Sequence, residues 1–229
     1  MTGIRATLKR GFDRLERPLD KLFGADWNPL SNLGPLGWFL FWVVAATGIY
    51  LFIFFDTGVV NAYQSVEWLS ETHWFHAGVA RSLHRYASDL LVVVMLVHLL
   101  REWSFDRYRG RRWFSWITGV PVIWFVYMSG ITGYWLVWDK LAQYVALTTT
   151  ELLDALPFFA EPIARNFLTP ESLSGRFFTL LVFLHIAIPL MLLLMMWIHI
   201  QRITSARTKP PRGLSVLTLA ALVIVSFAM

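Results

Sequence analysis

Four of the six histidines in this sequence form two pairs with the same internal spacing, and histidine is a common ligand of metals and metal cofactors. The four are His84, His98, His185 and His199. His84 and His98 are 14 residues apart, and so are His185 and His199. Fourteen residues of α-helix rise ~21 Å and return to within ~40° of the starting direction. Each pair would therefore place two imidazoles on one side of a helix, at two depths.

Two such helices facing each other would bring the imidazoles together as two pairs. A zinc site takes four protein ligands, or three and an open position, so a pair of histidines does not suit it. Two imidazoles do suit the two axial positions of a haem iron, which then transfers electrons and has no open position for dioxygen. Simple packing is the alternative explanation, although ionisable residues inside membranes are rare and usually functional. The spacing favours two haems b, held without a thioether link because the chain has no cysteine.

Glycines repeat the same interval on two other apolar segments. Gly34 and Gly48 are 14 residues apart, as are Gly119 and Gly133. Glycine would let a flat macrocycle approach a helix closely, although small residues also serve helix packing in membranes.

Three arginines lie where the anionic propionates of a haem would need partners. Arg81, Arg101 and Arg202 are each three residues from the nearest of the four histidines. Arginine can bind a carboxylate through two hydrogen bonds. Arg101 and Arg202 have a second explanation as the basic flanks of membrane spans, which does not apply to Arg81.

The elements that would carry these residues are membrane-spanning helices. The chain is 56% hydrophobic with a mean hydropathy of +0.53, which excludes an ordinary soluble domain. A helical span takes ~20 apolar residues, and the sequence predicts four, at about Pro35–Phe55, Val79–Arg101, Trp113–Trp138 and Phe177–Ile200. A fifth apolar run, Leu214–Met229, is a little short for a span. The predicted fold is all-α, a transmembrane four-helix bundle binding two haems, with a fifth C-terminal helix left open.

Basic residues set the expected topology. Apolar residues recur at helical spacing over residues 4–23, which predicts an amphipathic helix at the membrane interface. Fifteen of the 20 Lys and Arg residues fall in 1–33, 101–112 and 202–212, so the positive-inside rule places the N-terminus on the cytoplasmic, negative side. The expected division is an interfacial segment 1–33, a dihaem bundle 34–205, and a basic linker with an apolar helix 206–229.

The pattern resembles the N-terminal half of the cytochrome b family, which serves the cytochrome bc complexes and their chloroplast counterpart. The resemblance covers about residues 25–205. It rests on Trp27-Asn28, Asn32-Leu33-Gly34, Thr47-Gly48, Arg81-Ser82-Leu83-His84, His98-Leu99-Leu100-Arg101, Gly119, Gly133-Tyr134, Trp138, Arg176-Phe177-Phe178, His185, Pro189 and His199. By this resemblance, His84 and His185 would bind the lower-potential haem near the positive side, and His98 and His199 the higher-potential haem near the negative side. Arg81 and Arg101 match arginines that meet propionates in the family.

The sequence departs from the family around its quinone sites. Where the family usually has Pro-Trp-Gly-Gln in its quinol-oxidising pocket, this chain has Val137-Trp138-Asp139-Lys140. Tyr134, Trp138, Asp139 and Lys140 are therefore the candidate residues near a quinone pocket. Thr204 stands where the mitochondrial type has a further histidine.

The expected function is electron transfer in a quinol- or quinone-linked respiratory or photosynthetic oxidoreductase complex. The expected location is a bacterial inner membrane or an equivalent energy-transducing membrane. Expected partners are membrane lipid, a quinone, and a c-type cytochrome or Rieske iron–sulfur subunit, with no nucleic acid. Two alternatives remain open: the cytochrome b anchor of a membrane dehydrogenase, such as a formate dehydrogenase or hydrogenase, and a proton-coupled transporter.

Overall fold

The structure, a computed structural model, describes residues 3–157, 166, 168 and 173–228. Four of its helices are long and apolar enough to cross a membrane. They are α2 (Leu33–Phe52), α4 (Val79–Ser104), α5 (Trp113–Val137) and α8 (Gly175–Ile200). The predicted all-α transmembrane bundle is confirmed, and each predicted span matches a helix to within a few residues at its ends.

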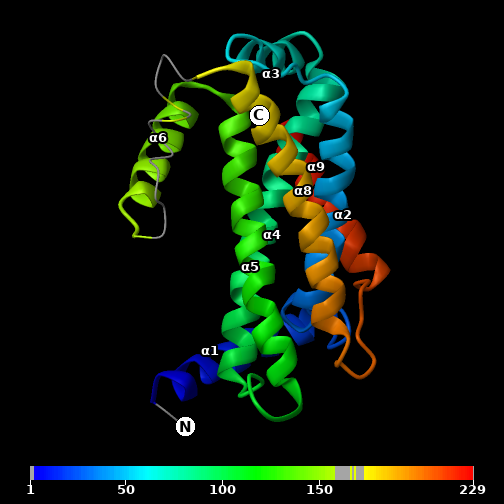
Figure 1. The fold of residues 1–229 in the computed structure, drawn as a ribbon. Helices are drawn as coiled ribbons and strands as arrows, with labels where there is room; N and C mark the ends of the chain where they lie inside the picture. The colour runs from blue at the N-terminus through cyan, green and yellow to red at the C-terminus, as the bar shows by residue number, and fades with distance from the viewer. Residues whose placement is uncertain (1–2, 158–165, 167, 169–172, 229) are drawn as a thin grey trace.

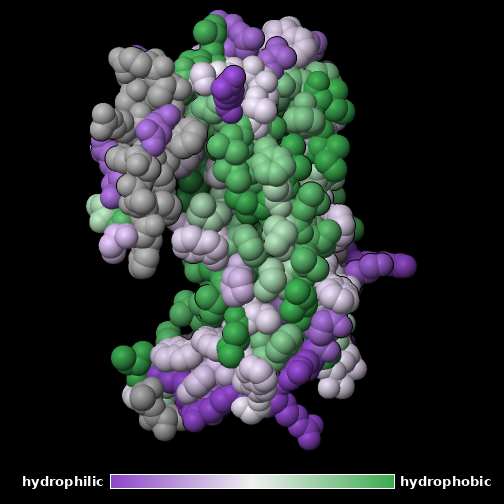
Figure 2. Space-filling model, in the orientation of Figure 1, coloured by the Kyte–Doolittle hydropathy of each residue, from purple (hydrophilic) through white to green (hydrophobic). Residues whose placement is uncertain are grey.

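The bundle is built from two helix pairs, with α2 packed along α4 and α5 packed along α8 (Figure 1). Leucine, valine and phenylalanine side chains fill the space between helices, and Leu40 is completely buried. The outer surface is also apolar, as the broad green band in Figure 2 shows. Ile49 is 70% exposed and Leu190 is 63% exposed. Such side chains are suited to lipid, where an apolar exterior costs nothing.

The amphipathic N-terminal helix is present as α1 (Gly3–Phe23). It lies across one end of the bundle, beside the loop between α4 and α5 (Figure 1). Arg5 near its start is buried and donates to Asp106 and Tyr108 of that loop, both at 2.8 Å. Ile4 and Leu22 remain exposed on α1, as expected of a helix that faces lipid headgroups and acyl chains. This end of the molecule is called the α1 end below.

The fifth apolar run forms α9 (Arg212–Phe227), which packs on α4. Gly213 near its start lies against Trp27 near the α1 end. Phe227 at its end contacts Phe75 just before α4, with 6.4 Å between ring centroids. The helix therefore follows the bundle from one end toward the other, although its 16 residues rise only ~24 Å.

Two further helices lie in segments between the predicted spans. Residues 56–76 contain α3 (Asn61–Glu71), and residues 139–176 contain α6 (Lys140–Asp154). Both are amphipathic and too short to span a membrane, so a search for apolar runs does not find them. Figure 1 places α3 across the end of the bundle opposite α1, the α3 end, with α6 beside the bundle near that end.

Candidate cofactor site

The four predicted histidines lie on α4 and α8 at two levels of the bundle. His84 and His185 form the pair nearer the α3 end, with ring centroids 6.3 Å apart and ring planes 71° apart. A metal–imidazole bond is about 2.0 Å, so two rings ligating one iron from opposite sides would have centroids about 6 Å apart. This observed separation fits a bis-histidine iron. His98 and His199 lie on the same two helices nearer the α1 end, within electrostatic range of each other.

Each of the four predicted glycines faces one of the four histidines. A Cβ on Gly48 would lie 3.0 Å from Cε1 of His84, and a Cβ on Gly133 only 2.5 Å from Cε1 of His185. The same distance is 3.2 Å from Gly119 to His199 and 3.8 Å from Gly34 to His98. At Gly48, Gly119 and Gly133 the absent Cβ leaves space for the imidazole ring. Space for a macrocycle at these glycines remains a prediction.

Three of the histidines are also hydrogen-bonded to a threonine. The Oγ1–Nδ1 distance is 3.2 Å in all three pairs, which are Thr47–His84, Thr118–His199 and Thr132–His185. Each threonine hydroxyl also lies 2.8 Å from the carbonyl oxygen four residues earlier in its own helix, to which it donates. Since its proton is used there, the oxygen is left to accept a hydrogen bond from Nδ1–H.

Backbone carbonyls fix the same tautomer. Nδ1 of His84 lies 3.0 Å from the carbonyl oxygen of Val44, which can only accept. His185 and His199 bond the backbone of Ser129 and Ser115 in the equivalent way. With hydrogen on Nδ1, the lone pair is on Nε2, which is the form that ligates a metal.

Thr118 and Thr132 were not among the predicted site residues. Each directly precedes a glycine that faces a histidine, as Thr47 does. The repeated Thr-Gly dipeptide could have revealed them. Leu33 occupies this place before the fourth such glycine.

The arginines expected near propionates have protein partners here. Arg81 donates to Ser70 Oγ at 2.7 Å. The buried Arg101 pairs with Glu16 of α1 at 2.7 Å and stacks over Phe105. Arg101 is therefore held beside the α1 end of the bundle, and a propionate there would share it with a carboxylate.

The four candidate residues near a quinone pocket lie where α5 meets α6. Trp138 is buried, with a left-handed backbone (φ 55°), and packs on Phe178 with 5.0 Å between ring centroids. Asp139 caps α6 by accepting from the backbone N–H of Ala142 at 2.7 Å. Lys140 is the first residue of α6, and Tyr134 is partly exposed on α5. Trp138 and Asp139 thus have structural contacts that sequence reasoning did not foresee.

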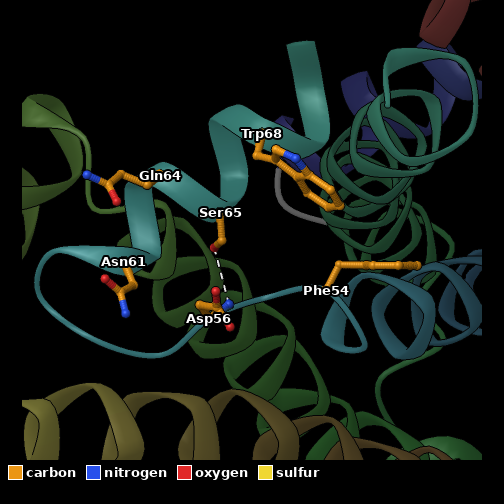
Figure 3. A pocket seen from close by; sticks show the side chains of 6 residues that line it. All are labelled: Phe54, Asp56, Asn61, Gln64, Ser65 and Trp68. Carbon is orange, nitrogen blue, oxygen red and sulfur yellow. Dashed lines mark hydrogen bonds between the residues drawn. The ribbon is translucent and has the colours of Figure 1, made fainter. Parts of the chain in front are cut away.

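A separate pocket of about 540 Å³ opens at the α3 end, between the end of α2 and α3 (Figure 3). It is lined by Phe54, Asp56, Asn61, Gln64, Ser65 and Trp68. The backbone N–H of Asp56 donates to Ser65 Oγ across it at 3.2 Å. None of the predicted site residues lines this pocket.

The comparison with known families decides the assignment. The family model for cytochrome b/b6/petB matches residues 20–206. The chain belongs to the cytochrome b family. Among solved structures it is similar to a chain from a hyperthermophilic respiratory Complex III, with a TM-score of 0.67 and 18% identity over 87% of this chain. At that identity the likeness supports the fold alone.

The match covers 57% of the Complex III chain, so this cytochrome b spans a little over half the length of that neighbour. The family and the four apolar helices make it an integral membrane protein of electron transport, and the family implies binding of haem b. The glycine-lined histidines fit that group.

Proposed function

We propose that this cytochrome b carries electrons across its membrane between two bis-histidine haems b, within a quinol- or quinone-linked oxidoreductase complex. The observation that carries the proposal is the His84–His185 pair. Its rings, on two different helices, have centroids 6.3 Å apart, and each lies against a glycine whose added Cβ would come within 3.0 Å of the ring.

Each residue of the site then has a definite part. His84 and His185 ligate the iron near the α3 end, and His98 and His199 the iron near the α1 end. Within each helix the two histidines are separated by ~21 Å of helical rise. When bound, each haem supplies a one-electron carrier. Arg81 and Arg101 are the proposed partners of the propionates at the two ends.

The charge distribution supports the proposed orientation. Most of the basic residues belong to α1, the α4–α5 loop and the α8–α9 connection. These elements lie at the α1 end (Figure 1). The positive-inside rule places that end on the cytoplasmic, negative side of a bacterial inner membrane or an equivalent membrane. The α3 end then faces the positive side, where a c-type cytochrome or a Rieske subunit would exchange electrons. The proposed complex is of the kind that supplies its neighbour in fold, a chain of a respiratory Complex III.

A potentiometric titration of the purified protein tests the proposal. We expect the reduced-minus-oxidised spectrum to show b-type haem that titrates as two one-electron steps. A short-chain quinol added to the oxidised protein should reduce part of this signal. A protein purified without haem would overturn the proposal and favour a proton-coupled transporter. Two haems that no quinol reduces would overturn only the quinone link.

A further inference from the structure

The two histidine pairs differ in their hydrogen bonds. At the α3 end, both rings bond a threonine, with Thr47 on His84 and Thr132 on His185, each at 3.2 Å. At the α1 end, only His199 has such a partner, in Thr118.

His98 is the exception among the four. It faces Gly34 at the more relaxed distance of 3.8 Å, and the residue before that glycine is Leu33, which has no hydroxyl. Across the part of the chain that the structure describes, His98 has no hydrogen-bond partner. Three of the four histidines therefore lie against a glycine and bond the threonine that precedes it. His98 lies against a glycine but has no such threonine.

A hydrogen bond from Nδ1–H changes the ligand strength of the imidazole. An acceptor at Nδ1–H makes the opposite nitrogen, Nε2, a stronger donor to the metal. Stronger donation stabilises the more positive, oxidised iron, and hydrogen bonding around the ligands is one of the means by which a protein sets a haem potential. The α3-end level has two accepting threonines and the α1-end level has one. This difference lowers the reduction potential of the α3-end level relative to that of the α1-end level.

The surrounding charges act in the same direction. Arg101, Arg107 and Arg112 lie within electrostatic range of His98, together with the carboxylate of Glu102. Glu16 offsets one of these three positive charges through its pair with Arg101. A net positive surrounding favours the reduced iron and so raises the potential at the α1 end.

We propose that Thr47 and Thr132 are positioning residues that hold the haem site at the α3 end at a lower reduction potential than the site at the α1 end. The proposal rests on the bis-histidine ligation of the proposed function. Part of the potential difference between the two levels would then come from the one additional threonine hydroxyl at the α3 end. Leu33, which has no hydroxyl, leaves His98 without the corresponding hydrogen bond.

The test is a potentiometric titration of the haem-loaded full chain carrying Thr132→Val, Thr47→Val or both. Valine keeps the branched shape and removes the acceptor. We expect only the lower-potential step to move upward in the double variant, by up to about tenfold in the redox equilibrium, or about 59 mV for one electron. Thr132→Ser keeps the hydroxyl and should restore the parental potential. Leu33→Thr should lower only the higher-potential step.

Thr148→Val is the matched control, because that hydroxyl bonds only carbonyls of its own helix, α6, and should shift neither step. Two haems with unshifted potentials in the double valine variant would overturn the inference and leave the proposed function intact. Equal shifts of both steps would also overturn it, since they would report a general change in structure. Absence of two haems in the parent protein would instead defeat the proposed function.

Discussion

Alanine at Gly133 should expel the haem from the α3 end of the bundle. The added Cβ would lie 2.5 Å from Cε1 of His185 and 3.2 Å from both ring nitrogens. Carbon atoms in contact prefer about 3.5–4.0 Å, so the ring must move by about 1 Å, away from the position in which it faces His84. Overpacking of this kind costs about 1–3 kcal/mol, equivalent to about 5- to 150-fold weaker retention of the cofactor.

The assay is the ratio of haem to protein after purification, together with the redox titration of what remains. The Gly133→Ala variant should retain about one haem. The remaining titration step should be that of the haem at the α1 end, which His98 and His199 would ligate. Gly130→Ala is the control on the same helix, because nothing lies within 4 Å of its added Cβ. Gly34→Ala, at 3.8 Å from His98, should also be tolerated. A Gly133→Ala protein with two haems and parental potentials would refute the reasoning.

Two further predictions concern the helices that flank the bundle. Valine at Gly213 would occupy the space of the Trp27 ring, so α9 should loosen and proteolysis of the α8–α9 connection should accelerate; an unchanged cleavage rate would contradict the packing described. At the α1 end, the hydrogen bond from Arg109 lowers the pKa of Asp106, and Arg5 of α1 binds the same carboxylate. Because the pKa of Asp106 is lowered in the folded state, the contact between Arg5 and Asp106 should persist above the ordinary carboxyl range. It should be lost as the pH falls through the lowered pKa. The protection of α1 against hydrogen exchange, measured relative to the intrinsic rate at each pH, should therefore fall in acid in the parent, whereas Asp106→Asn should lack this protection at neutral pH as well.

The sequence predicts the spans and the histidine levels because both depend on local regularities. An apolar run of about 20 residues has few alternatives to a membrane helix. An interval of 14 residues determines which faces and depths the histidines share. The Thr-Gly dipeptides at 118–119 and 132–133 are separated by the same interval of 14 residues. Their role became clear only from the hydrogen bonds of Thr118 to His199 and of Thr132 to His185.

Other features depend on contacts between distant residues and could not be predicted. The partner of Arg101 is Glu16, 85 residues away, and it is brought there by the way α1 crosses the end of the bundle. Trp138, which stays a candidate residue near a quinone pocket, packs on Phe177 and Phe178 of α8, about 40 residues later in the chain. Helix α6 carries no long apolar run, and its N-cap, Asp139, was read as a candidate for chemistry.

The central claim is that α4 and α8 share two haems, one histidine from each helix at each level. Its most direct test is the haem content and redox titration of four single variants, His84→Leu, His98→Leu, His185→Leu and His199→Leu. The account predicts that His84→Leu and His185→Leu lose the same titration step, and that His98→Leu and His199→Leu lose the other. A different pairing, or a variant that keeps both haems, would contradict it.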